Sequence, residues 1–126
     1  MDPYKLKPID ANQRRVLVVD DETDVAYSFA NLLEALGYHA CCAYEGLAAL
    51  AAAAEFRPDT VFVDIGLPDM DGYELGRRLR ERFPNVRVVA LSGDPTEEGQ
   101  NMAKAFFDAF ILKPGNLRYI EQALAR

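Results

Sequence analysis

TVFVDIGLPDMDGYEL, residues 60–75, is the stretch that determines the fold class of this chain. It begins with an unbroken apolar run, which is typical of a strand covered by helices on both faces. The run ends at Asp64, and the glycine, proline and aspartate residues that follow predict a loop over 65–70. Beyond the loop the apolar spacing becomes that of a helix running through Phe83. The stretch therefore predicts one strand, loop and helix unit of an α/β domain.

The same alternation continues on both sides of this unit. Short apolar runs alternate with helical patterns five times, which predicts a parallel sheet with helices on both faces. Because crossovers between parallel strands are right-handed, five such strands favour a doubly wound, flavodoxin-like sheet of order 2-1-3-4-5 with five helices. The expected strands cover residues 16–19, 38–43, 60–64, 86–91 and 109–112.

The helical patterns also predict which side chains face the sheet. Thr23 is expected to be the N-cap of the first helix and Gly37 its C-cap, while Pro58 ends the second helix. The expected inward residues, helix by helix, are Val25, Phe29, Leu32, Leu33 and Leu36; Leu47, Leu50, Ala51 and Ala54; Leu75, Leu79 and Phe83; Met102, Ala103 and Phe106; and Leu117, Ile120 and Leu124.

Length and charge restrict the class of protein further. The chain has 126 residues, enough for one domain, which we expect to cover residues 14–126 after a loose N-terminal lead-in over 1–13. Its net charge of -6 argues against binding to nucleic acid or to an anionic membrane surface. Without a secretory signal or a membrane-length apolar run, we expect a cytoplasmic protein whose partners are proteins or small cations.

Charged and polar residues stand where four of the expected strands end. Asp20 and Asp21 follow the first strand, Asp64 ends the third, and Ser92 and Lys113 follow the fourth and fifth. In a doubly wound sheet these positions meet at the crevice where the winding reverses. Carboxylates gathered in this way repel one another unless a cation balances them, most simply a hard divalent ion assisted by the lysine. The pattern therefore predicts a site for phosphoryl transfer.

Four motifs in this order resemble the receiver domain of two-component response regulators, over essentially all of residues 14–126. The motifs are Val18-Val19-Asp20-Asp21-Glu22, the segment from Val63-Asp64 through Leu67-Pro68-Asp69-Met70-Asp71-Gly72 to Leu75, Ala90-Leu91-Ser92-Gly93, and Phe110-Ile111-Leu112-Lys113-Pro114.

The resemblance implies that Asp64 is the phosphoacceptor, taking a phosphoryl group from a phosphohistidine of a partner. It further implies that Mg2+ is bound by Asp21, Asp64 and the carbonyl of Gly66, and by Asp20 through water. A weakly nucleophilic carboxylate needs such positioning and charge neutralisation. Gly66 has no side chain that would place or exclude an attacking water.

The remaining implied roles concern the response to phosphorylation. Lys113 and the Ser92 hydroxyl are expected to bind phosphoryl oxygens, with Lys113 aimed inward by a cis bond to Pro114. Phe110 stands at the position of the family's switch aromatic and is expected to rotate into the space that the Ser92 hydroxyl leaves. A plain core aromatic is the alternative for Phe110.

As a receiver, the chain is expected to be a signalling domain and not an enzyme, although it assists its own phosphorylation and dephosphorylation. Its partners would be a histidine kinase or a histidine phosphotransfer protein, and a downstream protein. The chain ends after its fifth helix, which leaves a stand-alone receiver, expected to be a monomer, or the receiver of a hybrid histidine kinase.

Three other functions are weighed against this one. A degenerate receiver would serve only as a protein-binding module, although all the acidic positions, Ser92 and Lys113 are present. A flavin carrier of the same fold is disfavoured because the acidic turn after the first strand would repel the flavin phosphate. A hydrolase of the haloacid type requires a second acid two residues after the nucleophile, where this chain has Gly66.

Overall fold

A computed structural model describes residues 14–113 and 117–124, and its core is a five-stranded parallel sheet. The expectations for the lead-in over 1–13 and for the bond before Pro114 lie outside these residues. The order β2-β1-β3-β4-β5 confirms the predicted doubly wound, flavodoxin-like sheet. The strands are β1 (Arg15–Val19), β2 (His39–Ala43), β3 (Thr60–Asp64), β4 (Arg87–Ser92) and β5 (Ala109–Leu112).

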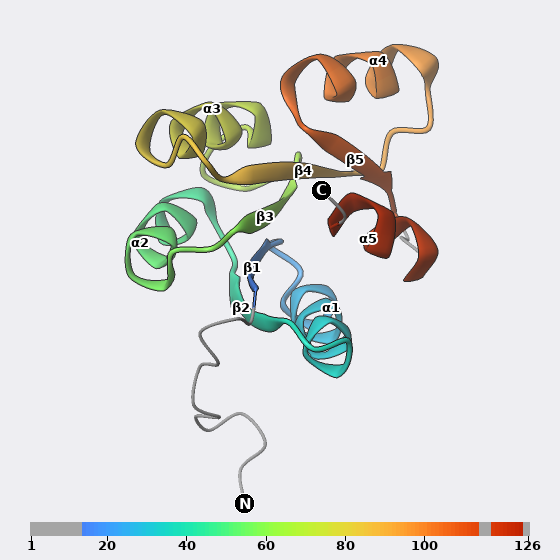
Figure 1. The fold of residues 1–126 in the computed structure, drawn as a ribbon. Helices are drawn as coiled ribbons and strands as arrows, with labels where there is room; N and C mark the ends of the chain where they lie inside the picture. Colours follow the sequence, from blue (N-terminus) through green and yellow to red (C-terminus); the bar gives the residue numbers. More distant parts are fainter. Residues whose placement is uncertain (1–13, 114–116, 125–126) are drawn as a thin grey trace, which may run out of the picture.

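Five helices cover the two faces of the sheet (Figure 1). Helices α1 and α5 pack on one face and α2, α3 and α4 on the other, so that the sheet separates two apolar clusters. The helices are α1 (Thr23–Ala35), α2 (Gly46–Phe56), α3 (Gly72–Arg82), α4 (Glu97–Phe106) and α5 (Leu117–Leu124). None of the helices in the described part of the chain has the length and apolarity needed to cross a bilayer.

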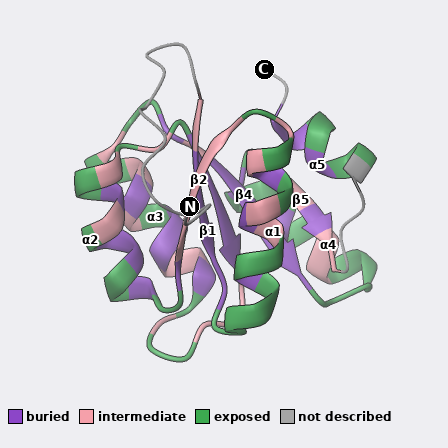
Figure 2. Cartoon of the chain, turned by 90° about the horizontal axis from the view of Figure 1, so that it is seen from below, coloured by how far each residue is buried: buried purple, intermediate pink, exposed green. Residues whose placement is uncertain are grey.

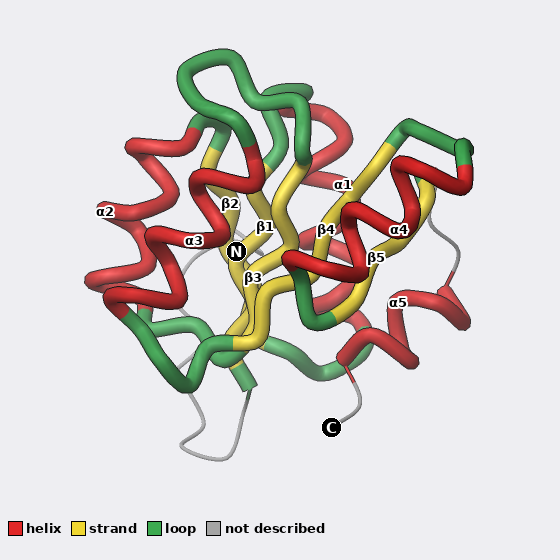
Figure 3. The backbone as a smooth tube through the Cα atoms, turned by 90° about the horizontal axis from the view of Figure 1, so that it is seen from above, coloured by secondary structure: helices red, strands yellow, loops and turns green. Residues whose placement is uncertain are grey.

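The central strands are buried on both faces, as their unbroken apolar runs predict (Figure 2). Leu17 and Val19 face the cluster under α2, α3 and α4, whereas Val16 and Val18 face the cluster under α1 and α5. Phe62 is fully buried at the centre of the second cluster. Because the strands are parallel, the loops that follow their carboxyl ends lie at one edge of the sheet (Figure 3).

The predicted inward faces of α1, α2 and α4 were only partly right: Leu33, Leu50 and Ala103 are buried as predicted, but most of the other predicted residues are not. In α1 the buried residues are Ala26, Ala30 and Leu33, and in α2 they are Gly46, Ala49, Leu50 and Ala53. Leu47 is 59% exposed, and in α4 both Met102 and Phe106 are exposed while Ala103 is buried. The physical reason is that small residues let a helix backbone approach the sheet closely, so large side chains move to the rim of the contact.

The helix-face predictions for α3 and α5 were better. Leu75 and Leu79 of α3 are fully buried and Phe83 is partly buried, and Ile120 and Leu124 of α5 are buried. Both helices have polar residues on their outer face, so their apolar stripe is unambiguous.

Both ends of α1 differ slightly from the prediction. Thr23 is the first helical residue and Glu22 takes the N-cap position, because the Asp20 carboxylate already holds the Glu22 amide in a turn. At the other end Leu36 is the C-cap and Gly37 follows it with a φ of 97°. The amide of Gly37 donates to the Glu34 carbonyl and that of Tyr38 to the Leu33 carbonyl, the Schellman pattern that requires a left-handed residue.

Candidate functional site

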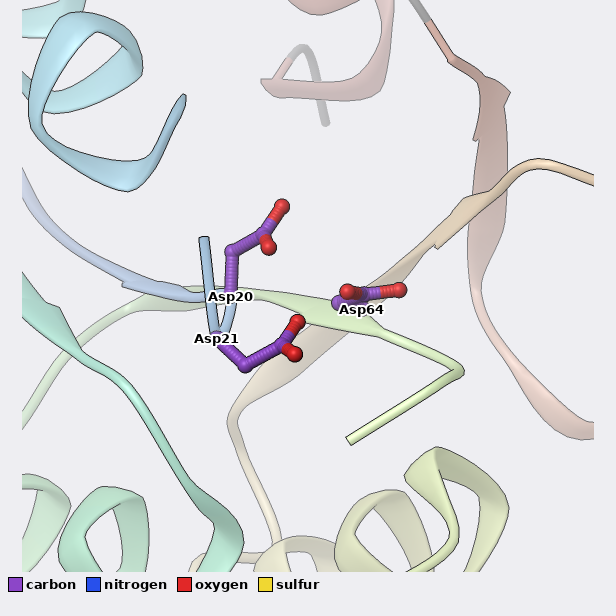
Figure 4. Close-up of side chains that lie close together, drawn as sticks. All are labelled: Asp20, Asp21 and Asp64. Carbon is purple, nitrogen blue, oxygen red and sulfur yellow. The ribbon is translucent and has the colours of Figure 1, made fainter. Parts of the chain in front are cut away.

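Three carboxylates meet where β1 and β3 end, beside the reversal of winding in the sheet. β1 and β3 are neighbours paired in register, Val19 opposite Val63, so the residues that follow them are adjacent. Asp20, Asp21 and Asp64 each place one carboxylate oxygen within 4.8 Å of the others (Figure 4). The structure thus brings Asp64 together with two adjacent acids that lie more than forty positions earlier in the chain.

Asp20 is the most enclosed of the three acids. Its relative exposure is 0%, and its two oxygens have different partners. Oδ1 accepts a hydrogen bond from the Glu22 amide at 3.0 Å, and Oδ2 accepts one from Lys113 Nζ at 2.6 Å. A buried carboxylate is tolerated when its charge is paired and hydrogen-bonded in this way. Asp21, by contrast, is exposed to solvent.

Asp64 ends β3 with its carboxylate between an amide and an ammonium. Oδ1 accepts from the Gly66 amide at 3.1 Å, and Oδ2 lies 3.3 Å from Lys113 Nζ. Burial raises the pKa of Asp64, and the neighbouring Asp20 charge acts in the same direction, whereas the Gly66 amide and Lys113 lower the pKa. The net direction is upward, so burial makes the ionised form of Asp64 costly.

Lys113 follows β5 and crosses the ends of β4 and β3 to reach the acids. Its amide donates to the Ser92 carbonyl at 2.8 Å, which fixes the backbone from which the side chain extends. Burial lowers the pKa of Lys113, but its hydrogen bond to Asp20 and the charges of Asp64 and Asp20 outweigh burial and raise the pKa. Lys113 is therefore a protonated counter-charge for two carboxylates.

Ser92 is the last residue of β4 and not, as predicted, the first residue of the following loop. Its side chain is buried, and its Oγ accepts a hydrogen bond from the Asp94 amide at 3.1 Å. Asp94 in turn accepts from the Thr96 amide, and Thr96 caps α4 by accepting from the Gly99 amide. The hydroxyl is thereby linked to the start of α4, and its proton is left to donate elsewhere.

Phe110 lies in β5 opposite Ala90 of β4 and is partly buried against the cluster under α2, α3 and α4. Lys104 of α4 places Nζ 5.6 Å from the centroid of the Phe110 ring, within the range of a cation–π contact. Phe110 thus joins β5 to α4 in this structure.

The donor set at the strand ends suits a hard divalent cation. Carboxylate and carbonyl oxygens are the ligands of Mg2+, and Asp20, Asp21 and Asp64 bring carboxylate oxygens close enough together to surround one ion. Gly66 belongs to the loop that leaves the same strand end, and its amide already contacts Asp64. These residues therefore fit the predicted metal site by their chemistry and proximity.

One residue beside the site was not identified from the sequence. Asp69, in the loop after β3, accepts hydrogen bonds from the amides of Gly46 and Leu47 at the start of α2. The partners lie 22 or more positions away in the chain, so no local spacing pattern indicates the contact. An aspartate three positions after a loop glycine was the only available signal.

Removal of the Asp64 charge is expected to stabilise the metal-free protein. Asp64→Asn keeps an oxygen for the Gly66 amide but ends the repulsion with Asp20 and the cost of burying the charge, so we expect a gain of about 1 kcal/mol at pH 7. Because the pKa of Asp64 is raised, the gain should shrink as the pH falls through that pKa and vanish below the ordinary value of 3.8. Urea unfolding with a metal chelator, at several pH values, measures this; a less stable variant at pH 7 would contradict it.

Comparison with known proteins identifies the family of this chain. A family model described as the response regulator receiver domain matches residues 16–125. The sensor histidine kinase RcsC of Salmonella typhimurium is 33% identical over 125 residues, and the transcriptional regulatory protein TcrX of Mycobacterium tuberculosis, described as probable, is 33% identical over 116. These matches cover 98% and 91% of this chain, but only 13% of RcsC and 50% of TcrX.

A solved structure is also similar. It is a response regulator from Burkholderia pseudomallei with a phosphorylated aspartic acid, a calcium ion and citrate, which is 29% identical to this chain with a TM-score of 0.80. The match covers 90% of this chain and 67% of that protein.

Proposed function

The chain belongs to the receiver domain family of response regulators, and on this basis we propose that it accepts a phosphoryl group on Asp64 within a two-component phosphorelay. The single observation that carries the proposal is the convergence of Asp20, Asp21 and Asp64 with the Lys113 ammonium at one end of the sheet. The Asp64 carboxylate, whose charge is balanced by Lys113 and which lies beside the exposed Asp21, is suited to receive an anionic group.

The transfer moves a phosphoryl group from a donor phosphohistidine to Asp64. A carboxylate oxygen of Asp64 forms a bond to phosphorus while the bond from phosphorus to the imidazole nitrogen breaks, and that nitrogen retains the electron pair. Lys113 Nζ, 3.3 Å from Asp64 Oδ2, is placed to pair with a phosphoryl oxygen, and the Ser92 hydroxyl supplies a second donor. The chain would assist its own phosphorylation by positioning the phosphoryl group and neutralising its charge, as expected for a signalling domain.

Asp20, Asp21, Asp64 and the Gly66 carbonyl would hold Mg2+. When bound, Mg2+ supplies positive charge that the phosphoryl oxygens and the carboxylates share. The B. pseudomallei relative, whose structure contains a phosphorylated aspartic acid and a calcium ion, supports this assignment by similarity. Asp20 also accepts a hydrogen bond from Lys113, which holds the ammonium beside the acceptor.

Phosphorylation would change the surface around α4. The Ser92 hydroxyl is linked through Asp94 and Thr96 to the start of α4, so its movement toward a phosphoryl group would release one of these contacts. Phe110 would then rotate into the vacated space and leave the Lys104 ammonium. A protein that binds the two forms with different affinity would read the change. The phosphodonor would be a histidine kinase or a histidine phosphotransfer protein in the cytoplasm.

Acetyl phosphate with Mg2+ tests the proposal directly. We expect the intact protein to gain the mass of one phosphoryl group, a gain that hydroxylamine removes because an acyl phosphate is labile to it. The gain should be absent in Asp64→Asn and when Mg2+ is chelated, whereas Asp59→Asn, an aspartate at the opposite end of the sheet, should react normally. No gain in the native protein would instead favour a degenerate receiver, and an equal gain in Asp64→Asn would exclude Asp64 as the acceptor.

A further inference from the structure

The loop from β3 to α3, residues 65–71, follows directly from the strand that ends at Asp64, and Figure 3 shows the path of its backbone. The Gly72 amide donates to the Ile65 carbonyl at 3.0 Å and closes the loop. Asp71 caps α3 by accepting from the Tyr73 amide at 2.9 Å. The base of the loop is therefore fixed by its own backbone and by the helix that follows.

The far part of the loop is held by a different helix. Asp69 Oδ1 accepts from the Gly46 amide at 2.7 Å, and Oδ2 accepts from the Leu47 amide at 2.9 Å. Glu45, the N-cap residue of α2, makes no capping hydrogen bond with its side chain. Asp69 therefore supplies, from a distant loop, the acceptor that a helix N-terminus requires.

A second contact reinforces the first. A β-carbon added at Gly46 would lie 2.5 Å from Met70 Cγ and 2.7 Å from Met70 Sδ, so Met70 packs directly on the backbone of Gly46. Met70 also packs against the cluster under α2, α3 and α4. Two consecutive loop residues, one ionic and one apolar, are thus seated on the first turn of α2.

From these contacts we propose that Asp69 is a positioning residue for the phosphoacceptor site, acting through the segment that carries Gly66. Gly66 is exposed, and its amide donates a hydrogen bond to Asp64 Oδ1. Three residues on, with a stiff proline between, the chain is anchored to α2. The anchor fixes where the Gly66 carbonyl and amide lie relative to Asp64, which lowers the cost of ordering them on binding.

The inference rests on the proposed function, because it assigns Gly66 to the Mg2+ site. It goes beyond that function by making the start of α2, which contributes no ligand, part of the support for the site. Residues that orient a metal ligand affect the affinity for the metal although they do not contact the ion.

Calorimetric titration of the full chain with Mg2+ tests the inference. We expect Asp69→Ala to raise the Kd for Mg2+ about fivefold. This is a smaller rise than the one caused by mutating a residue that contacts a metal ligand directly. Asp69→Asn retains a carbonyl oxygen that accepts from one amide, so we expect a smaller rise, of about twofold. Since both variants lose the same charge, equal effects in the two would show a long-range charge effect only and would overturn the inference.

Two further variants test whether a change in Mg2+ affinity arises from the contacts of Asp69 and Met70 with α2 or from another cause. Asp59→Ala removes an aspartate whose Oδ2 accepts from the Arg15 amide at 2.8 Å at the other end of the sheet, and it should leave the Kd for Mg2+ unchanged. Gly46→Ala displaces Met70 from α2 without changing any charge, and it should weaken Mg2+ binding in the same direction as Asp69→Ala. If the Asp69 variants fail to fold, Gly46→Ala carries the test.

The outcomes distinguish the inference from the proposal beneath it. An unchanged Kd for Mg2+ in Asp69→Ala and Gly46→Ala, beside normal binding by the native chain, would overturn the inference alone. No uptake of Mg2+ by the native chain would overturn both. Amide resonances of Gly46, Leu47 and Gly66 give an independent readout. All three should shift in Asp69→Ala only if the contact of Asp69 with α2 also positions Gly66.

Discussion

Replacement of Lys113 by methionine is expected to lower the stability of the metal-free protein by about 3 kcal/mol, the lower end of the cost of breaking a buried ion pair. Methionine preserves much of the side-chain length but removes the ammonium, which lies 2.6 Å from Asp20 Oδ2 and 3.3 Å from Asp64 Oδ2. Asp20 is fully buried, so its charge cannot be hydrated in compensation. Urea unfolding at pH 7 in the presence of a chelator measures the loss.

The pH dependence of this loss follows from the direction of the Lys113 shift. The pKa of Lys113 is raised above its ordinary value of 10.5, so the stabilising ion pair is fully present below pH 10.5 and is lost as the pH rises through the raised pKa. The difference between native and Lys113→Met proteins should therefore be constant near neutral pH and disappear only in strong alkali.

A matched double variant shows whether the orphaned carboxylate is the cause. Asp20→Asn combined with Lys113→Met leaves no buried charge at that position and should recover most of the lost stability. The same Lys113→Met protein should react with acetyl phosphate about 100-fold more slowly, since one donor to the developing charge is gone. Stability equal to that of the native protein, or a double variant worse than both single variants, would contradict the assignment of Lys113 as the counter-charge of Asp20.

Alanine at position 72 is expected to destabilise the protein by about 2–3 kcal/mol, at the upper end of the cost of overpacking. Gly72 is the first residue of α3, where alanine would normally be favoured over glycine by helix propensity. A β-carbon there would lie 2.5 Å from Ile65 Cα and 2.7 Å from the Asp64 carbonyl oxygen, and these backbone atoms cannot move aside cheaply. The steric cost therefore reverses the sign that propensity predicts.

The second effect of Gly72→Ala falls on the site. Because the clash involves the backbone of Asp64 and Ile65, relief of the clash displaces the phosphoacceptor, and we expect phosphorylation by acetyl phosphate to slow by at least about tenfold. Gly93→Ala is the matched control, since a β-carbon there has no neighbour within 4 Å and stability should change by less than about 0.5 kcal/mol. Thermal unfolding of both variants gives the comparison; a Gly72→Ala protein as stable as Gly93→Ala would mean that the loop backbone yields easily.

The arrangement of the sheet and the meeting of the acids could be predicted because they depend on few, local features. Four of the five strands were unbroken apolar runs that ended at a charged or polar residue, so the parallel order placed Asp20, Asp21, Asp64 and Lys113 at one edge. The predicted boundaries differed from the observed ones by about one residue, as at Ser92, because a hydroxyl can end a strand as readily as it begins a loop.

Other features could not be predicted because several local patterns fitted equally well. Helix α2 is rich in alanine on all sides, so nothing in its pattern separates the face with Ala49 and Ala53 from the face with Leu47. The exposed Phe106 of α4 illustrates the same difficulty, since its ring lies edge-on to Tyr73 of α3 at 5.5 Å and not on the sheet.

By itself, then, the sequence determined the class of fold, the ends of the strands and the set of chemical groups carried there, since each of these follows from backbone sterics and from the period of the apolar pattern over a few residues. Only the tertiary structure decided which groups touch: that Lys113 pairs with Asp20 more closely than with Asp64, that Asp69 caps α2, and that Gly72 has no room for a methyl group. Such contacts join segments far apart in the chain, and their distances depend on how every intervening helix packs on the sheet. The pattern of residue types limits which chemical groups can pair, whereas the packing of the backbone determines which of these groups lie close enough to pair.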